Sequence, residues 1–136
     1  MNNECLFCKI LNKEIPSYHI YENEYVYAFL DAFPNADGHT LVIPKKHFKD
    51  FSSTDDLYII EVAKAKKIVA KILMDKIKDI KGFNFVSNQE AIASQVIFHY
   101  HEHVVPKYIK EEGYLHNKNV ILKHKVHDLH KILKDS

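Results

Sequence analysis

Three histidines alternate with other residues at positions 98–106, where the sequence reads FHYHEHVVP. Successive side chains of a β-strand point to opposite faces, so His99, His101 and His103 would share one face, about 6.6 Å apart at ~3.3 Å per residue. A single histidine in a strand is usually structural, but burying three unpaired imidazoles would cost several kcal/mol. We therefore interpret this run as functional.

Two chemistries fit this spacing. Alternate histidines can ligate a catalytic zinc ion that keeps one open coordination position. Alternatively, one imidazole is a nucleophile that its neighbours orient. An ordinary imidazole has a pKa near 6.5 and is largely neutral at pH 7, as a nucleophile must be. The spacing alone is compatible with both.

Cys5 and Cys8 are the only cysteines and form a Cys-x-x-Cys pair. In a reducing compartment such a pair indicates metal binding or redox chemistry before a structural disulfide. Residues 1–8 lack the basic start of a signal peptide, and no segment approaches the ~18 apolar residues that a membrane helix needs. We therefore expect a cytoplasmic protein with no membrane partner.

The composition predicts one globular domain spanning residues 1–136. Its 136 residues are 46% hydrophobic and 27% charged, which suits a single fold with a real core. A net charge of +1 offers no field for binding nucleic acid, so we expect no nucleic-acid partner. All 19 basic side chains are lysines, so the bidentate guanidinium fork is missing and any phosphate must be bound by other donors.

Periodicity and turn residues predict an α+β fold with an antiparallel sheet of about five strands, one long helix and a C-terminal helix. The expected order is a short helix at 5–13, strands at 18–22, 25–31 and 39–44, the long helix, strands at 83–88 and 96–105, and the last helix at 118–134.

The long helix is expected to start at the polar run 53–56 and to end near Gly82. Its apolar positions recur at helical spacing, at Leu57, Ile60, Ile68, Ile72 and Ile77 with Lys64 between them, reinforced by Ala65, Val69 and Leu73. In the last helix the repeat is Leu122, Val126, Leu129 and Leu133, and His124, His127 and His130 are expected to form a polar surface row.

The histidine run resembles the signature of the histidine triad (HIT) family, His-φ-His-φ-His-φ-φ with φ apolar. Further blocks are similar to the Hint branch of that family, in its order: Phe7-Cys8-Lys9-Ile10, Lys13-Glu14-Ile15-Pro16, Ala28-Phe29-Leu30-Asp31 and 38–47 (GHTLVIPKKH). The resemblance covers a HIT-like core at about 5–108 and leaves a C-terminal helical extension at about 113–136.

This resemblance implies a nucleotide hydrolase that cleaves at the α-phosphorus of purine nucleoside phosphoramidates or dinucleoside polyphosphates, through a covalent nucleotidyl-histidine intermediate. His101 matches the nucleophile, His103 the residue that contacts the phosphate, and His39 a histidine that helps to hold the triad. Asn88 and Gln95 match polar substrate-binding positions. Preorganised backbone N–H groups would then replace the missing arginines.

The resemblance also implies a site for the nucleoside of an AMP-like purine nucleotide. Asp31 matches the carboxylate that binds the ribose, although a turn residue closing a strand is the alternative. Four apolar residues match the cleft around the base, with core packing as their alternative: Leu6, Phe7, Ile10 and Phe29. Members of this branch pair as homodimers, so the same is expected of this chain.

A structural zinc site is implied by the bacterial-type members that carry a Cys-x-x-Cys pair. The corresponding ligands here are Cys5, Cys8, His47 and His99. A closed Cys₂His₂ set stabilises a fold and leaves no position for a substrate.

Three residues depart from the family pattern. Glu102 occupies an apolar position but should face away from the triad. Ser94 replaces a glycine, and Val96 replaces a hydroxyl that contacts phosphate. Two alternatives therefore stay open, a zinc-dependent hydrolase and a nucleotide-binding sensor or interaction module with weak catalysis.

Overall fold

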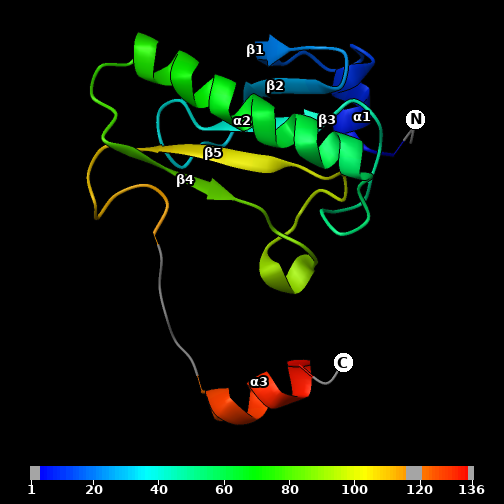
Figure 1. Cartoon of the computed structure of the whole chain (residues 1–136). Helices are drawn as coiled ribbons and strands as arrows, with labels where there is room; N and C mark the ends of the chain where they lie inside the picture. The colour runs from blue at the N-terminus through cyan, green and yellow to red at the C-terminus, as the bar shows by residue number, and fades with distance from the viewer. Residues whose placement is uncertain (1–3, 116–120, 135–136) are drawn as a thin grey trace.

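The computed structural model describes residues 4–115 and 121–134, which form a five-stranded antiparallel sheet and three α-helices. The strand order is β1-β2-β3-β5-β4 (Figure 1). The strands are β1 (Tyr18–Glu22), β2 (Val26–Leu30), β3 (Thr40–Pro44), β4 (Gly82–Val86) and β5 (Glu102–Lys107). The predicted α+β class and its five strands are therefore confirmed.

The first two strands form a hairpin because Asn23 closes the turn between them. Its Oδ1 accepts hydrogen bonds from the backbone N–H groups of Tyr25 and Val26, at 2.8 and 3.0 Å. Asparagine is favoured in turns for this reason. A bulge between His19 and Tyr21 shifts the register of β1 against β2.

Each face of the sheet carries its own hydrophobic core, because strand residues alternate between faces. The helix α2 (Asp56–Lys76) covers one face and packs against Val26, Ala28, Val42 and Val104. The opposite face packs Phe29, Leu41 and Ile43 against the short helix α1 (Leu6–Leu11).

The sequence periodicity of α2 combines two apolar stripes, and only one of them is buried. The buried positions include Val62, Ala65, Val69 and Leu73. Leu57 and Ile60 are about half exposed, at 48% and 51%, and lie on the outer side. The smaller stripe is the buried one because alanine and valine allow the helix axis to approach the sheet closely.

The long helix ends at Lys76 and not near Gly82, because Ile77 takes an extended backbone conformation with φ of −118°. Ile77 then packs back onto the α2 core, and the chain turns into β4.

The histidine run is only partly a strand, which corrects the predicted range of 96–105. The pairing of β3 with β5 ends at Val42 and Glu102, and the pairing of β4 with β5 ends at Val86 and His103. Pro44 at the end of β3 has no N–H to donate, and its carbonyl accepts a hydrogen bond from the ring of His99. Residues 96–101 therefore lie outside the ladder.

The C-terminal helix α3 is shorter than predicted, at Val126–Lys134. Residues 118–120 of the predicted range lie outside the described residues, and residues 121–125 are not helical. In Figure 1, α3 lies apart from the sheet, on the side of its β4 edge.

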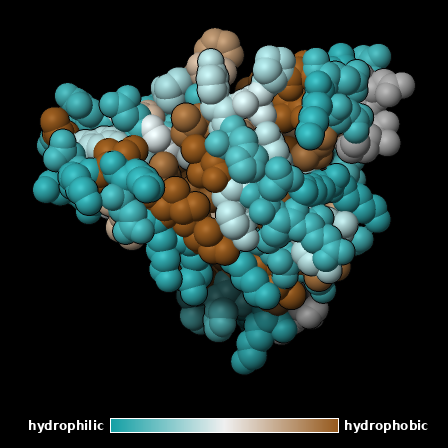
Figure 2. All heavy atoms as spheres, turned by 90° about the horizontal axis from the view of Figure 1, so that it is seen from above, coloured by the Kyte–Doolittle hydropathy of each residue, from teal (hydrophilic) through white to brown (hydrophobic). Residues whose placement is uncertain are grey.

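The surface seen from above is mostly hydrophilic, with hydrophobic side chains in separate strips (Figure 2). Within residues 4–115 and 121–134, no helix has the length and apolar character to cross a membrane.

Candidate active site and metal centre

One ring nitrogen of His101 makes a hydrogen bond to the backbone, and the other keeps its lone pair. Its Nδ1 lies 2.7 Å from the carbonyl oxygen of His99, which can only accept, so Nδ1 carries the proton in the neutral ring. The unprotonated Nε2 is then the atom with nucleophilic character. His101 is only 8% exposed, and burial is the main cause that lowers its pKa below the ordinary value.

His103 is oriented by a chain of hydrogen bonds that begins at the backbone. The N–H of Asn35 donates to Nδ1 of His39 at 3.0 Å, so the proton of a neutral His39 is on Nε2. That nitrogen lies 2.9 Å from Nδ1 of His103, which therefore accepts. His103 is left with its proton on Nε2, where it can donate to a phosphate oxygen. Burial, followed by the charges of His101 and His39, lowers the pKa of His103 to about 4.

Asp31 lies beside this chain of hydrogen bonds, and only one of its two carboxylate oxygens is near a histidine of the chain. Its Oδ1 accepts from the backbone N–H of Phe33 at 2.9 Å, in a turn, and its Oδ2 lies 3.6 Å from Nε2 of His39. The donor atoms of Asp31, His39 and His103 are close enough together to hold a metal ion. Such an ion would need a lone pair on Nε2 of His39, which the hydrogen bond from Asn35 to Nδ1 disfavours.

Three of the four apolar residues expected around a base are buried. Phe7, Ile10 and Phe29 are 2%, 8% and 4% exposed and belong to the core under α1, whereas Leu6 is 41% exposed. The rings of Phe7 and His101 meet in a T-shaped contact, with centroids 5.1 Å apart and planes at 86°. Phe7 therefore packs directly against the middle histidine of the run.

Asn88 and His103 open onto one small cavity of about 50 Å³, lined also by Asn35, Val86, Val105 and Tyr114. The predicted polar position Asn88 thus lies beside His103, the histidine expected to contact the phosphate. Tyr114 was not predicted, because nothing in the sequence after Pro106 shows that the chain turns back toward β4. Asn35 was missed because its contribution is a backbone N–H.

Gln95 is buried and uses its side-chain amide to hold the loop between β4 and the triad. Its Nε2 donates to the carbonyls of Lys49 and Ile97, and its Oε1 accepts from the N–H of Glu90. Two residues of this loop have positive φ, 76° at Glu90 and 74° at Ser94. A glycine adopts such a conformation without strain, so the glycine that the family pattern has at the position of Ser94 suits this backbone better than serine does.

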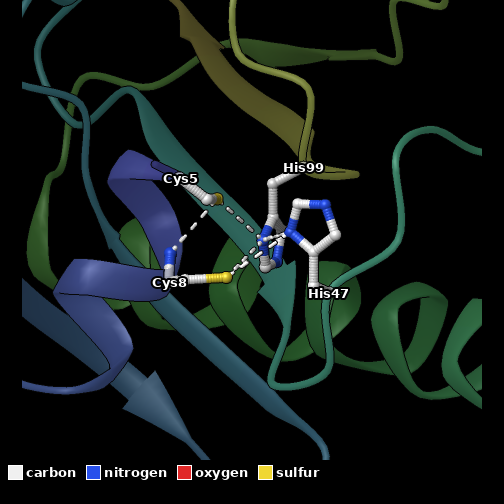
Figure 3. A group of neighbouring side chains, drawn as sticks. All are labelled: Cys5, Cys8, His47 and His99. Atoms are coloured by element: carbon white, nitrogen blue, oxygen red, sulfur yellow. Dashed lines mark hydrogen bonds between the residues drawn. The ribbon is translucent and has the colours of Figure 1, made fainter. Parts of the chain in front are cut away.

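The second group of functional side chains lies at the start of α1 (Figure 3). Cys5 is the N-cap residue of α1 and Cys8 lies in its first turn, and they meet His47 and His99, whose rings lie face to edge. All four donor atoms lie within 4.8 Å of one another. The individual distances are 3.4 Å for Cys5 Sγ–His99 Nδ1, 3.4 Å for Cys8 Sγ–His47 Nδ1, 3.6 Å for Cys8 Sγ–His99 Nδ1 and 3.2 Å for His47 Nδ1–His99 Nδ1.

These distances fit a tetrahedral metal. Bonds of ~2.3 Å to sulfur and ~2.0 Å to nitrogen would place ligand atoms about 3.5 Å (S···N) and about 3.3 Å (N···N) apart. His99 donates from Nε2 to the Pro44 carbonyl at 3.1 Å, so its Nδ1 has a lone pair. Burial lowers the pKa of His99 to about 4, which keeps this lone pair available at neutral pH. The four residues can therefore hold a metal ion.

Glu102 faces away from the triad, as the strand alternation predicts. Its carboxylate accepts from the hydroxyl of Tyr100 at 2.6 Å and from Nζ of Lys66 in α2 at 3.1 Å. Burial and this carboxylate raise the pKa of Tyr100. The group ties α2 to the start of β5 and leaves the other face to the histidines.

Comparisons with known proteins agree with this arrangement. The HIT domain model matches residues 12–110. An uncharacterized HIT-like protein of Mycoplasma genitalium is 48% identical, over 98% of this chain and 94% of its own. The adenosine 5′-monophosphoramidase of Saccharomyces cerevisiae is 37% identical, over 80% of this chain and 66% of its own. The crystal structure of a HIT family member from Bacillus subtilis is similar with a TM-score of 0.87 and 36% identity, over 98% of this chain and 94% of that one.

Proposed function

The chain belongs to the HIT domain family, and from this premise we propose that it is a nucleotide hydrolase whose nucleophile is His101. The proposed substrates are purine nucleoside phosphoramidates or dinucleoside polyphosphates, cleaved at the α-phosphorus. The yeast relative is named as an adenosine 5′-monophosphoramidase, which supports this substrate class.

One observation carries the proposal, namely the complementary protonation of two neighbouring rings. His101 has a bare Nε2 because its Nδ1 donates to the carbonyl of His99. His103 has a protonated Nε2 because its Nδ1 accepts from His39. A nucleophile beside a hydrogen-bond donor suits attack on a phosphorus whose oxygens gain charge in the transition state.

In the proposed reaction, Nε2 of His101 forms a bond to the α-phosphorus while the bond to the leaving group breaks. The leaving group departs with the bonding electron pair, and an amine leaving group takes up a proton from solvent. Nε2–H of His103 stabilises the phosphate oxygens. Water then attacks the phosphorus, its hydroxyl stays on the nucleoside monophosphate and its other proton goes to solvent, and the electrons of the phosphorus–nitrogen bond return to Nε2 of His101. Asn88 would contact the phosphate, and Gln95 would act by shaping the loop that approaches it.

For the nucleoside, we propose that Asp31 binds the ribose hydroxyls. Leu6, Phe7, Ile10 and Phe29 are proposed to form the apolar wall against which the base rests. Leu6 is the exposed member of this set, and the other three form the packed layer beneath it.

We further propose that Cys5, Cys8, His47 and His99 hold a structural zinc ion. Two thiolates and two imidazoles complete a tetrahedral shell, so zinc would fix α1 against the histidine run and take no part in the reaction. Thiol ligands need a reducing compartment, so a cytoplasmic location belongs to this proposal. A homodimer is also proposed, because β4 is an edge strand that a second copy can cover.

The test of the nucleophile is His101→Gly, which removes the imidazole. We expect turnover of an adenosine phosphoramidate and of a diadenosine polyphosphate to be lost, while nucleotide affinity stays within about threefold, since binding contacts remain. Mass spectrometry of the quenched wild-type reaction should trap an adenylyl group on His101. His19→Ala on the exposed strand β1 is the control and should keep full activity. Residual full activity of His101→Gly would refute the mechanism.

A nucleotide sensor with weak catalysis is the second candidate, and one observation favours it. Val96, at the position where the family has a hydroxyl, is 83% exposed and can donate no hydrogen bond to phosphate. This candidate predicts nucleotide binding with no product over long incubation.

A further inference from the structure

The protonation of His103 depends on one exposed peptide group. The N–H of Asn35 donates to Nδ1 of His39, so the proton of His39 is on Nε2 and is donated onward to Nδ1 of His103. Without the N–H of Asn35 in line, His39 can carry its proton on Nδ1 instead, because a neutral imidazole has two tautomers. His103 would then donate from Nδ1 and leave its Nε2 without a proton. The position of the Asn35 peptide therefore controls which nitrogen of His103 can donate to a ligand.

That peptide group lies in a turn, residues 32–38, which joins β2 to β3 without regular secondary structure. Asn35 is exposed. Gly38 fixes the end of the turn, because its backbone, with φ of 90°, comes so close to Ile77 and Pro106 that an added Cβ would lie 3.2 Å from each. Exposed connections are the mobile parts of a fold unless other contacts hold them. The contacts around Asn35 therefore matter for the histidines.

A second segment lies beside this turn, namely residues 108–114, which we call the strap. The hydroxyl of Tyr108 donates to the carbonyl of Asp37 at 2.7 Å. Gly113 passes so close to Asn35 that an added Cβ would lie 3.1 Å from the carbonyl oxygen of Asn35. The strap and the turn also line a cavity of about 310 Å³ together. The strap thus lies directly against the residue whose N–H begins the chain of hydrogen bonds.

The strap is held in turn by Lys107, the last residue of β5. Nζ of Lys107 donates to the carbonyl oxygens of Glu112 and Tyr114, the second at 2.7 Å. The N–H of Glu112 also donates to the carbonyl of Ile109 at 3.1 Å, which closes a turn inside the strap. These bonds fix the strap relative to β5, the strand that carries His103.

We propose that the strap, through Gly113 and Tyr108, holds the N–H of Asn35 in line with His39 and so keeps the proton of His103 on Nε2. Gly113 and Tyr108 are then positioning residues, because they act through Asn35 and His39. This inference rests on the proposed function, in which Nε2–H of His103 donates to the phosphate. It adds the residues outside the triad on which that donor depends.

The experiment uses the full chain, with ¹⁵N-labelled histidine, in zinc-replete buffer at neutral pH. Long-range ¹H–¹⁵N NMR distinguishes protonated from bare ring nitrogens, and His39→Gln and His103→Gln assign the two sets of signals. We expect both rings of the wild-type chain to be protonated on Nε2. This measurement needs no substrate, so it reads the proton position whether or not the chain hydrolyses nucleotides.

Gly113→Ala is the principal variant. It places a Cβ against the carbonyl of Asn35 and strains a backbone whose φ is 79°. We expect the Nε2–H signal of His103 to weaken in favour of Nδ1–H. Since a transition-state donor is weakened, kcat for an adenosine phosphoramidate should fall about tenfold while KM stays within about threefold. Gly82→Ala is the matched control, because an added Cβ there meets no atom within 4 Å, and it should change none of these quantities.

Tyr108→Phe is the second variant and keeps the test decisive if Gly113→Ala fails to fold. It retains the ring and removes only the hydrogen bond to Asp37. We expect the same shift of the His103 proton and a fall in kcat of about threefold.

Unchanged proton positions in the folded variants overturn the inference, even if thermal midpoints or kcat fall, because the strap would then be only structural. A wild-type His103 that is protonated on Nδ1 overturns it as well. A wild-type chain with the expected proton positions that releases no product from adenosine phosphoramidate refutes the proposed function instead. In that case the NMR spectra of the variants still decide the role of the strap.

Discussion

Each buried histidine is assigned its chemistry by the group bonded to its second nitrogen. His101 donates to a backbone carbonyl and keeps Nε2 bare, and His99 donates to another and keeps Nδ1 bare. His39 accepts from a backbone N–H and must donate onward. Identical side chains at two-residue spacing thereby differ in chemistry. His101 and His99 each keep one bare nitrogen, which suits the proposed nucleophile and the proposed metal ligand, and His103 accepts a hydrogen bond from His39.

The pH dependence of the reaction follows from the burial of His101. Burial lowers the pKa of this imidazole, outweighing the raising effects of the His99 carbonyl, Asp31 and Glu102. The nucleophile must be neutral, and a lowered pKa keeps it neutral to lower pH. We therefore expect the acidic limb of kcat/KM for an adenosine phosphoramidate to have its midpoint below pH 6.5, the ordinary imidazole value.

A pH–rate profile in metal-replete buffer tests this expectation. Nucleotide affinity measured at the same pH values separates loss of binding from loss of the nucleophile. An acidic limb with its midpoint at or above pH 6.5 would contradict the assignment of a buried, neutral His101.

At the scale of elements, the loop that leads into the histidine run carries backbone strain. Ser94 has a φ of 74°, a region that side chains with a Cβ rarely adopt. Ser94→Gly removes this strain, and we expect it to raise the free energy of unfolding by about 1 kcal/mol in urea denaturation.

The matched control is Ser87→Gly, on the same loop but outside the residues with positive φ. It should be neutral or destabilising by about 0.5 kcal/mol, because glycine there only adds freedom to the unfolded chain. Equal effects of the two substitutions would show that strain at Ser94 is not the cause.

The short helix α1 is the element that the proposed zinc ion would stabilise. It has six residues, too few for stability on their own, and its two cysteines are its link to His47 and His99. We expect chelation to lower the thermal midpoint, with a loss of about 4 kcal/mol if free zinc was a thousand times its Kd. Activity should fall in parallel with the folded fraction.

His47→Ala provides the genetic version of this test, with His19→Ala as a control on an exposed histidine. The first should reduce the zinc content measured by mass spectrometry below one ion per chain, and the second should not. Loss of activity after chelation with an unchanged thermal midpoint would instead support the zinc-dependent hydrolase.

Elements defined by interactions between neighbouring residues were predicted more closely than elements defined by contacts between residues far apart in the sequence. The strand at 40–44 and the turn at Asn23 depend on local alternation and turn chemistry, and both were predicted closely. The strand at 96–105 was predicted too long, because its true start depends on Pro44, which ends the partner strand more than fifty residues earlier in the chain. The buried stripe of α2 was mixed with an exposed one, since periodicity alone does not say which side meets the sheet.

In the molecule as a whole, the two faces of the sheet carry different groups of residues, one structural and one proposed to be functional. One face carries α2 and the Tyr100–Glu102–Lys66 group, and the other carries α1, the proposed metal ligands and the histidines of the proposed reaction. Because strand residues alternate, the same short run serves both faces. A substitution at Glu102 therefore reaches the triad through the backbone and through its charge, which raises the pKa of His101.

The whole-molecule prediction concerns the proposed dimer. If association stabilises the folded chain, the thermal midpoint must rise with protein concentration, by mass action. We expect a rise of a few degrees over a hundredfold range of concentration for the full chain. A midpoint independent of concentration, with a monomeric mass by light scattering, would contradict the dimer.

The sequence by itself determined the family and the order of the elements, because these are carried by residue types, spacing and local turn chemistry. Only the tertiary structure decided which nitrogen of each histidine is free. The deciding partners include the N–H of Asn35 and the carbonyl of Pro44, which are backbone groups and leave no signal in the side-chain types. The tertiary structure also decided that α3 stands away from its own domain, because a periodic pattern specifies an apolar side but not the surface that covers it.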